Sequence, residues 1–492
     1  MDAVAGFSYQ DWFNQGFGAD AEEFITDLWT YNNLGAGGRE SLLPYSFKNM
    51  HKLASIFGRF NYDYDNRYLL SLSLRRDGSS RFGENRRWGL FPAASAAWRL
   101  SQDLSLPDAI TDLKLRVGYG VTGNQDIGNY AALETLAPGF RAVFGQQTQV
   151  GVAPNQFANP ELQWEEKSTL NLGVDFALFS GRLSGSAEYY RSTTEKLLAN
   201  LPVPQPAVVG TQLDNVGEME NTGVEFSLDG TIFDREDLNL SIGVTASRNN
   251  NEIVSLGGGR DRIVYGSVSG PGLTGVQSFI LQPGDPVGTF YGPVFAGFEN
   301  QNQIFKDYED TDGDGIGDEV VGTTPSPSTE DRQVVGSAEP DLIYGFSTQA
   351  TWKDWSLNAS FSGKYGQEIF NNTALTYAAK TQVLTNNNFL ASALDAPTDI
   401  EEAPVYSSRW IQNGSYLRLS SLTLGYTLTS LLPQVRRARV YVKGSNLFVL
   451  TPYDGYDPEV KTDNAGALPT KGVDYLNYPR PRTFTLGVSI NI

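Results

Sequence analysis

The stretch Thr483–Ile492, TFTLGVSINI, decides the fold class. Every second residue in it is large and apolar, and the residues between are small or polar. Successive side chains of a β-strand point to opposite faces, so a period of two indicates a strand between two unlike environments. We therefore predict a strand with one apolar and one polar face at this end of the chain.

The same alternation recurs along the whole chain. It is clear in residues 67–75, 113–119, 169–178, 224–232, 238–245, 357–365 and 422–428. We count about 14 such strands, which predicts an all-β fold. An antiparallel transmembrane β-barrel is the simplest structure with many strands of this kind, because it sets an apolar face against lipid and a polar face against its lumen.

The predicted connections between strands are alternately short and long. Long loops are expected at residues 14–50, 78–87, 122–163, 193–215, 251–340, 371–413 and 451–479, with short turns between them. Outer-membrane barrels have short periplasmic turns and long extracellular loops. A soluble β-sandwich also alternates along its strands, but it has no reason to segregate its loops by length.

Composition excludes several other classes of protein. The 492 residues include no cysteine and a single histidine, His51, so disulfides and histidine-based metal centres are not expected. The net charge of −19 argues against nucleic acid as a partner. No stretch approaches the roughly 18 apolar residues of a membrane helix. No nucleophile elbow, phosphate-binding loop or paired-carboxylate motif stands out, so we predict that the protein is not an enzyme.

Several motifs resemble the C-terminal barrel of the SusC/RagA class of TonB-dependent transporters. The clearest are Asn61–Gly83 (NYDYDNRYLLSLSLRRDGSSRFG), Leu113–Tyr130 (LKLRVGYGVTGNQDIGNY), Val216–Phe226 (VGEMENTGVEF) and Gly444–Val449 (GSNLFV). Together with weaker matches they cover essentially the whole chain in the family's order.

This resemblance implies a barrel of 22 strands with an N-terminal plug inside it. Residues 1–492 would then be the C-terminal part of the barrel, without the plug, the first strands or a signal peptide. The family's function would be active import of glycan fragments or peptides across the cell outer membrane. Implied partners are TonB, acting through the missing N-terminal part, a SusD-like lipoprotein lid, outer-membrane lipid, and the oligosaccharide or peptide substrate.

Two other functions remain open from the sequence. A passive porin or structural barrel would conduct without energy and would have no plug. A secreted β-rich glycan-binding module would be soluble without detergent.

An acidic loop is the best candidate for a metal site. Asp310, Asp312, Asp314 and Asp318 take positions 1, 3, 5 and 9 of an EF-hand-like loop, and Ile316 takes position 7, which contributes its carbonyl oxygen. The glutamate expected at position 12 is absent, because Val321 stands there. We predict a structural Ca²⁺ ion, and the alternative is a solvated acidic turn.

Aromatic residues in the long loops are candidates for contact with substrate or lid. Five are singled out: Tyr130, Phe140, Tyr265, Tyr291 and Trp410. Flat rings stack on sugars and grip peptide side chains. The alternative interpretation is that these rings pack the loops against one another.

Overall fold

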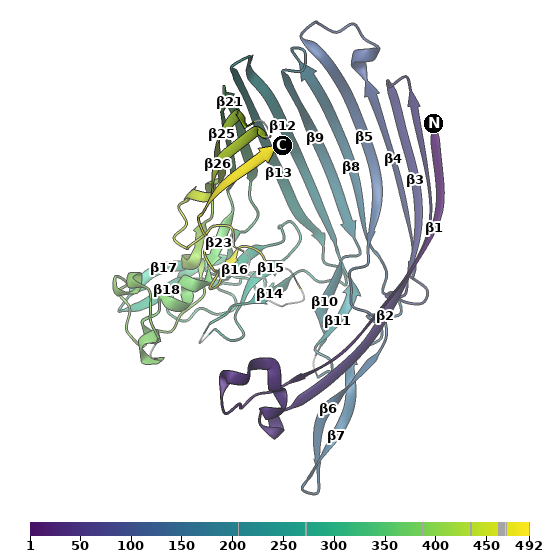
Figure 1. Ribbon diagram of the computed structural model, residues 1–492. Helices are drawn as coiled ribbons and strands as arrows, with labels where there is room; N and C mark the ends of the chain where they lie inside the picture. The colour runs from purple at the N-terminus through teal and green to yellow at the C-terminus, as the bar shows by residue number, and fades with distance from the viewer. Residues whose placement is uncertain are drawn as a thin grey trace.

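Fourteen strands form one antiparallel sheet in the computed structural model (Figure 1). The structure describes residues 1–204, 206–270, 273–385, 387–432, 435–460, 468 and 470–491. The predicted strand number is confirmed. In spatial order the strands are β1 (Asp2–Asp20), β2 (Leu43–Tyr64), β3 (Tyr68–Ser79), β4 (Trp88–Arg99), β5 (Ile110–Asn124), β8 (Glu165–Leu178), β9 (Leu183–Glu195), β12 (Glu218–Arg235), β13 (Leu238–Ser255), β21 (Leu342–Trp352), β22 (Trp355–Tyr365), β25 (Tyr416–Leu432), β26 (Val435–Leu450) and β28 (Thr483–Asn491).

The sheet forms a curved wall whose two edges, β1 and β28, do not pair with each other in the described residues (Figure 1). A barrel wall in lipid needs every strand edge paired, because the bilayer core offers no hydrogen bonds to free backbone groups. Over the described residues the wall is therefore an open arc. None of the helices among the described residues is long and apolar enough to cross a membrane.

Short connections and long loops lie at opposite ends of the wall, and both chain ends lie at the short-connection end (Figure 1). The predicted loop at residues 14–50 was too long, because β1 and β2 pair in register as far as Asp20 and Leu43. Backbone pairing between the two long strands carries the hairpin into both ends of the predicted loop.

The long loops contain further strands and short helices. The strands are β6 (Thr135–Phe144), β7 (Gln147–Gln156), β10 (Leu198–Pro202), β11 (Thr211–Asn215), β14 (Ile263–Ser267), β15 (Gln277–Leu281), β16 (Thr289–Pro293), β17 (Phe295–Glu299), β18 (Asn302–Glu309), β19 (Glu319–Thr324), β20 (Arg332–Ser337), β23 (Glu368–Asn371), β24 (Ile411–Asn413) and β27 (Val473–Asp474). The helices are α1 (Asn372–Tyr377) and the 3-10 helices η1 (Asp27–Ala36), η2 (Arg39–Ser41), η3 (Leu100–Gln102), η4 (Lys380–Thr385), η5 (Ala391–Leu394) and η6 (Ser408–Trp410).

Three of these loops fold into one compact unit, which we call the long-loop body. It consists of the described parts of residues 256–341, 366–415 and 451–482. β23 from the second loop pairs in parallel with β27 from the third. Buried residues from all three loops, among them Phe279, Phe290, Phe370 and Val473, share one hydrophobic core.

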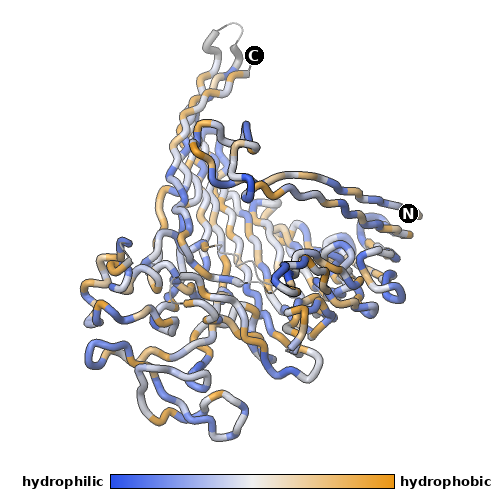
Figure 2. The backbone as a smooth tube through the Cα atoms, turned by 90° about the horizontal axis from the view of Figure 1, so that it is seen from below, coloured by the Kyte–Doolittle hydropathy of each residue, from blue (hydrophilic) through white to orange (hydrophobic). Residues whose placement is uncertain are grey.

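The wall has an apolar outer face and a polar inner face, as the alternation predicts. On β3, Leu70, Leu72 and Leu74 are exposed on the outer face, and Ser71 and Ser73 lie on the inner face. Figure 2 shows this alternation of hydrophobic and hydrophilic residues along the strands. Exposed leucines are the expected surface of a wall that faces lipid.

A charge on the outer face is expected to destabilise the inserted wall. Leu72→Arg puts a guanidinium in the middle of the apolar band of β3, and we expect a cost of ~2–4 kcal/mol. Ser73→Arg, one residue along on the inner face, is the matched control and should change the free energy of unfolding little. The comparison is made by denaturant titration of the intact protein folded into lipid vesicles. Equal costs for the two variants would contradict the assignment of the faces.

Candidate functional site

A row of polar and small residues crosses the inner face of the wall. Strand register sets Asp2, Asn61, Ser71, Ser95, Gly118, Asn171 and Tyr190 opposite one another, from β1 to β9. Cross-strand partners of this kind lie within contact distance. The Asn61 amide donates to Asp2 Oδ2 at 2.8 Å, and the Ser71 hydroxyl donates to Asn61 Oδ1 at 2.7 Å. The row gives the inner face a series of hydrogen-bonding side chains that only Gly118 interrupts.

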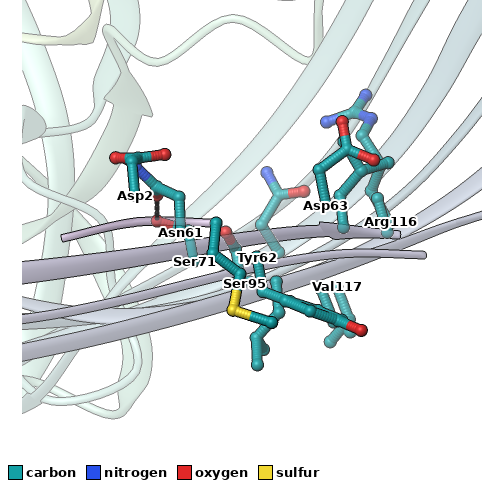
Figure 3. A pocket seen from close by; sticks show the side chains of 15 residues that line it. Asp2, Asn61, Tyr62, Asp63, Ser71, Ser95, Arg116 and Val117 are labelled. Carbon is teal, nitrogen blue, oxygen red and sulfur yellow. Dashed lines mark hydrogen bonds between the residues drawn. The ribbon is translucent and has the colours of Figure 1, made fainter. Parts of the chain in front are cut away.

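A pocket of about 540 Å³ lies over this row (Figure 3). Figure 3 shows Asp2, Asp63 and Arg116 on one side of the sheet and Val117 on the other. The pocket is lined by apolar side chains, among them Leu69, Leu70 and Val117, together with carboxylate, amide, hydroxyl and guanidinium groups. A mixed lining of this kind suits solutes that carry both polar and apolar groups.

Arg116 is the centre of an ion cluster beside this pocket. Its Nε and Nη2 donate to the two carboxylate oxygens of Asp175 at 2.9 and 2.8 Å, and Nη2 also donates to Glu188 Oε1 at 2.5 Å. Lys114 Nζ lies 2.7 Å from Asp175 Oδ2. Gly173 makes room for the guanidinium, since a Cβ there would lie 3.0 Å from Arg116 Cζ. The cluster pairs two cations with two anions and ties β5, β8 and β9 together.

Three of the five aromatic candidates lie inside the long-loop body. Tyr265, Tyr291 and Trp410 are 7%, 4% and 7% exposed. Burial raises the pKa of Tyr265, and the indole N–H of Trp410 donates to the carbonyl of Val405 at 3.0 Å. These side chains therefore stabilise the long-loop body, and they offer little surface to a substrate in this conformation.

The other two candidates lie in a different loop, residues 125–164. Tyr130 is 37% exposed. Its hydroxyl accepts a hydrogen bond from the backbone N–H of Met50 at 3.0 Å, which joins this loop to β2. Phe140 belongs to β6, and its side chain lies outside the described part of the structure. Contact of either residue with substrate or lid stays a prediction.

The acidic loop brings three of its predicted ligands together. Carboxylate oxygens of Asp310, Asp312 and Asp314 lie within 4.8 Å of one another. The backbone N–H of Gly315 donates to the Asp310 carboxylate at 2.7 Å and holds the pKa of Asp310 below its ordinary value. The Asp318 carboxylate is not one of the three, and it accepts a hydrogen bond from the Thr311 hydroxyl at 2.9 Å. Three converging carboxylates fit a hard cation such as Ca²⁺, and calcium binding stays a prediction.

Calcium is expected to stabilise residues 310–318 against proteolysis. For a site of the weak extracellular type, with a Kd near ~1 mM, 10 mM Ca²⁺ would stabilise the loop by ~1.4 kcal/mol. Asp312→Asn should remove this effect, and Asp237→Asn, an exposed carboxylate at the other end of the wall, should keep it. The measurement is the rate of proteolysis in Ca²⁺ and in a chelator. Identical rates for the unmodified protein would favour a solvated acidic turn.

Sequence reasoning did not single out a buried ion network at the base of the long-loop body. Arg418 on β25 is 3% exposed. Its Nη2 lies 2.5 Å from Asp457 Oδ1, and its Nε lies 2.8 Å from Glu459 Oε2. Arg480 Nη1 lies 2.8 Å from the same Glu459 oxygen. The network ties the last long loop to the wall. The sequence signal is faint, because the partners lie about 40 residues apart.

A family model described as TonB dependent receptor-like, beta-barrel, matches residues 2–447. The chain belongs to this TonB-dependent receptor family. The match covers the wall from β1 into β26, so the arc of 14 strands is part of an outer-membrane barrel, and the predicted family and location are confirmed. A family of receptors also favours the expectation that the chain is not an enzyme.

Relatives in this family are longer than the chain. The TonB-dependent receptor P3 of Formosa agariphila is 36% identical over 508 residues, which cover 100% of this chain and 50% of the relative. The TonB-dependent receptor SusC of Bacteroides thetaiotaomicron is 30% identical to this chain, and the alignment covers 48% of that relative. The chain spans about half the length of these curated relatives.

A solved structure described as the RagAB peptide transporter has the same fold. The two structures superpose with a TM-score of 0.82 and are 28% identical in sequence. The superposition covers 99% of this chain and 53% of the other chain. The arrangement of wall strands and long loops in this chain therefore also occurs in a solved structure.

Proposed function

We propose that the intact protein imports solutes that are too large for passive pores across the outer membrane, with energy supplied through TonB. The observation that carries this proposal is the match of almost the whole chain to the TonB-dependent receptor barrel family. In this proposal, residues 1–492 are the C-terminal part of the barrel. They supply the lipid-facing wall, a polar inner face and the long extracellular loops, and a plug elsewhere in the protein couples import to TonB.

We further infer that a SusD-like lipoprotein covers the long loops. Relatives with the names SusC and RagAB support this inference. A compact long-loop body with its own core supports it as well, because a folded unit presents a fixed surface to a partner whereas separate mobile loops do not.

The substrate class in this proposal is an oligopeptide or a glycan fragment. The similar RagAB protein is described as a peptide transporter, which favours peptides. The charged pocket of the inner face is compatible with peptides, whose termini and side chains carry both signs of charge.

Energised uptake is the direct test. Cells with and without the gene for the intact protein are given fluorescent peptide and glycan pools of similar size, before and after a protonophore collapses the proton gradient. We expect uptake of one pool to need both the gene and the gradient. Uptake that needs the gene but survives the protonophore would indicate a passive porin. A protein that is recovered soluble without detergent would instead indicate a secreted module.

A further inference from the structure

An apolar groove of about 640 Å³ crosses the outer face of the wall from β5 to β13. Its walls are outer-face side chains, among them Leu115, Leu172, Tyr189, Val224 and Phe226. The small residues Ala187 and Ala246 lie opposite Phe226 on either side in the strand register. These alanines leave the hollow that larger side chains would fill.

Arg248 lies at the long-loop end of this groove. Along β13 the outer-face residues Ile242, Val244 and Ala246 are apolar, and Arg248 is the first charged residue after them. Strand register places Arg248 directly opposite Val224, which is 52% exposed on the same face. A change from apolar to charged residues on a lipid-facing strand marks the level where hydrocarbon gives way to head groups.

The guanidinium of Arg248 has no ion pair within the described part of the structure. Arg191, which also lies on the outer face, behaves differently, since its Nε and Nη2 donate to Glu220 Oε2 at 2.9 and 2.7 Å. Arg191 is therefore neutralised by the protein itself. Arg248 keeps its donors available for an anion that comes from outside the chain.

We propose that the groove and Arg248 bind a phosphorylated glycolipid of the outer leaflet. An acyl chain lies in the groove, and a phosphate accepts hydrogen bonds from Arg248. Guanidinium and phosphate pair through two parallel hydrogen bonds, which are stronger than neutral ones. Because the long loops face the cell exterior, the long-loop end of the groove lies in the outer leaflet.

The test uses the intact protein purified in detergent, with diphosphoryl lipid A and its dephosphorylated form as probes. Bound lipid is counted by native mass spectrometry. We expect the unmodified protein to bind the phosphorylated form about fivefold more tightly, as one lipid-facing cation predicts. Arg248→Gln should remove this preference. Equal binding of the two forms by the unmodified protein, or a preference that survives in Arg248→Gln, would overturn the proposal.

Two further variants separate the groove from general charge effects. Ala246→Trp fills the groove and should weaken binding of both lipids, whereas unchanged binding would exclude the groove as the acyl site. The double variant Arg191→Gln with Glu220→Gln removes a cation from the same face together with its own anion, so the preference should remain. Loss of the preference in this control would show that Arg248 is not the phosphate ligand.

Discussion

Arg418→Ala is expected to destabilise the long-loop body by ~3–5 kcal/mol, because the substitution leaves two carboxylates at the buried network with too few partners. Asp457 and Glu459 are 12% and 25% exposed, so water solvates them poorly once the guanidinium is gone. Arg480 remains near both, but its own side chain is 40% exposed. The last long loop should then detach from β25 while the wall stays folded.

The measurement is native-state proteolysis of the long loops across a denaturant series, with the wall followed by its β-sheet signal. Arg86→Ala is the matched control, because Arg86 pairs with Glu161 at 3.0 Å on an exposed surface. Removal of an exposed pair of this kind costs ~0.2–1 kcal/mol. A similar small loss in Arg418→Ala would mean that the network does not hold the loop.

Phe290→Ala is expected to cost ~3–5 kcal/mol, the usual effect of emptying a buried phenylalanine site. Phe290 is fully buried. Its ring centroid lies 5.1 Å from that of Phe279 in the same loop and 6.5 Å from that of Phe370 in the next loop. The cavity would therefore weaken contacts between loops as well as within one.

Phe17→Ala provides the comparison for this cavity, since Phe17 is 92% exposed and the same atoms are removed. Its effect should stay within ~0.5 kcal/mol. The readout is again proteolysis of residues 256–341, 366–415 and 451–482 in denaturant. If both variants unfold at the same denaturant concentration as the unmodified protein, the three loops do not share a cooperative core.

The wall could be predicted from the sequence because its signal is local. Leu72 and Ser73 are adjacent, and their difference in polarity alone assigns them to opposite faces. The proximity of Asp310, Asp312 and Asp314 is equally local, because alternate residues before a glycine turn must lie close together.

The long-loop body could not be predicted in the same way. The sequence shows Tyr265 and Trp410 as loop aromatics whether they face a ligand or a protein core. Only the three-dimensional packing of the loops places them in the core that the three loops share. Arg418 likewise reads as one more polar residue on the inner face of a strand. Its burial depends on acidic residues that return to it from the following long loop.

Labelling of single cysteines in intact cells tests the central claim most directly, that this chain is an outer-membrane wall with its long loops outside. The chain has no cysteine of its own, so each introduced thiol is unique within it. Ser326→Cys lies in a long loop and Glu236→Cys in a short turn, and both positions are exposed. We expect a membrane-impermeant maleimide to label Ser326→Cys in intact cells and Glu236→Cys only after the outer membrane is permeabilised. Labelling of Glu236→Cys in intact cells would contradict the account.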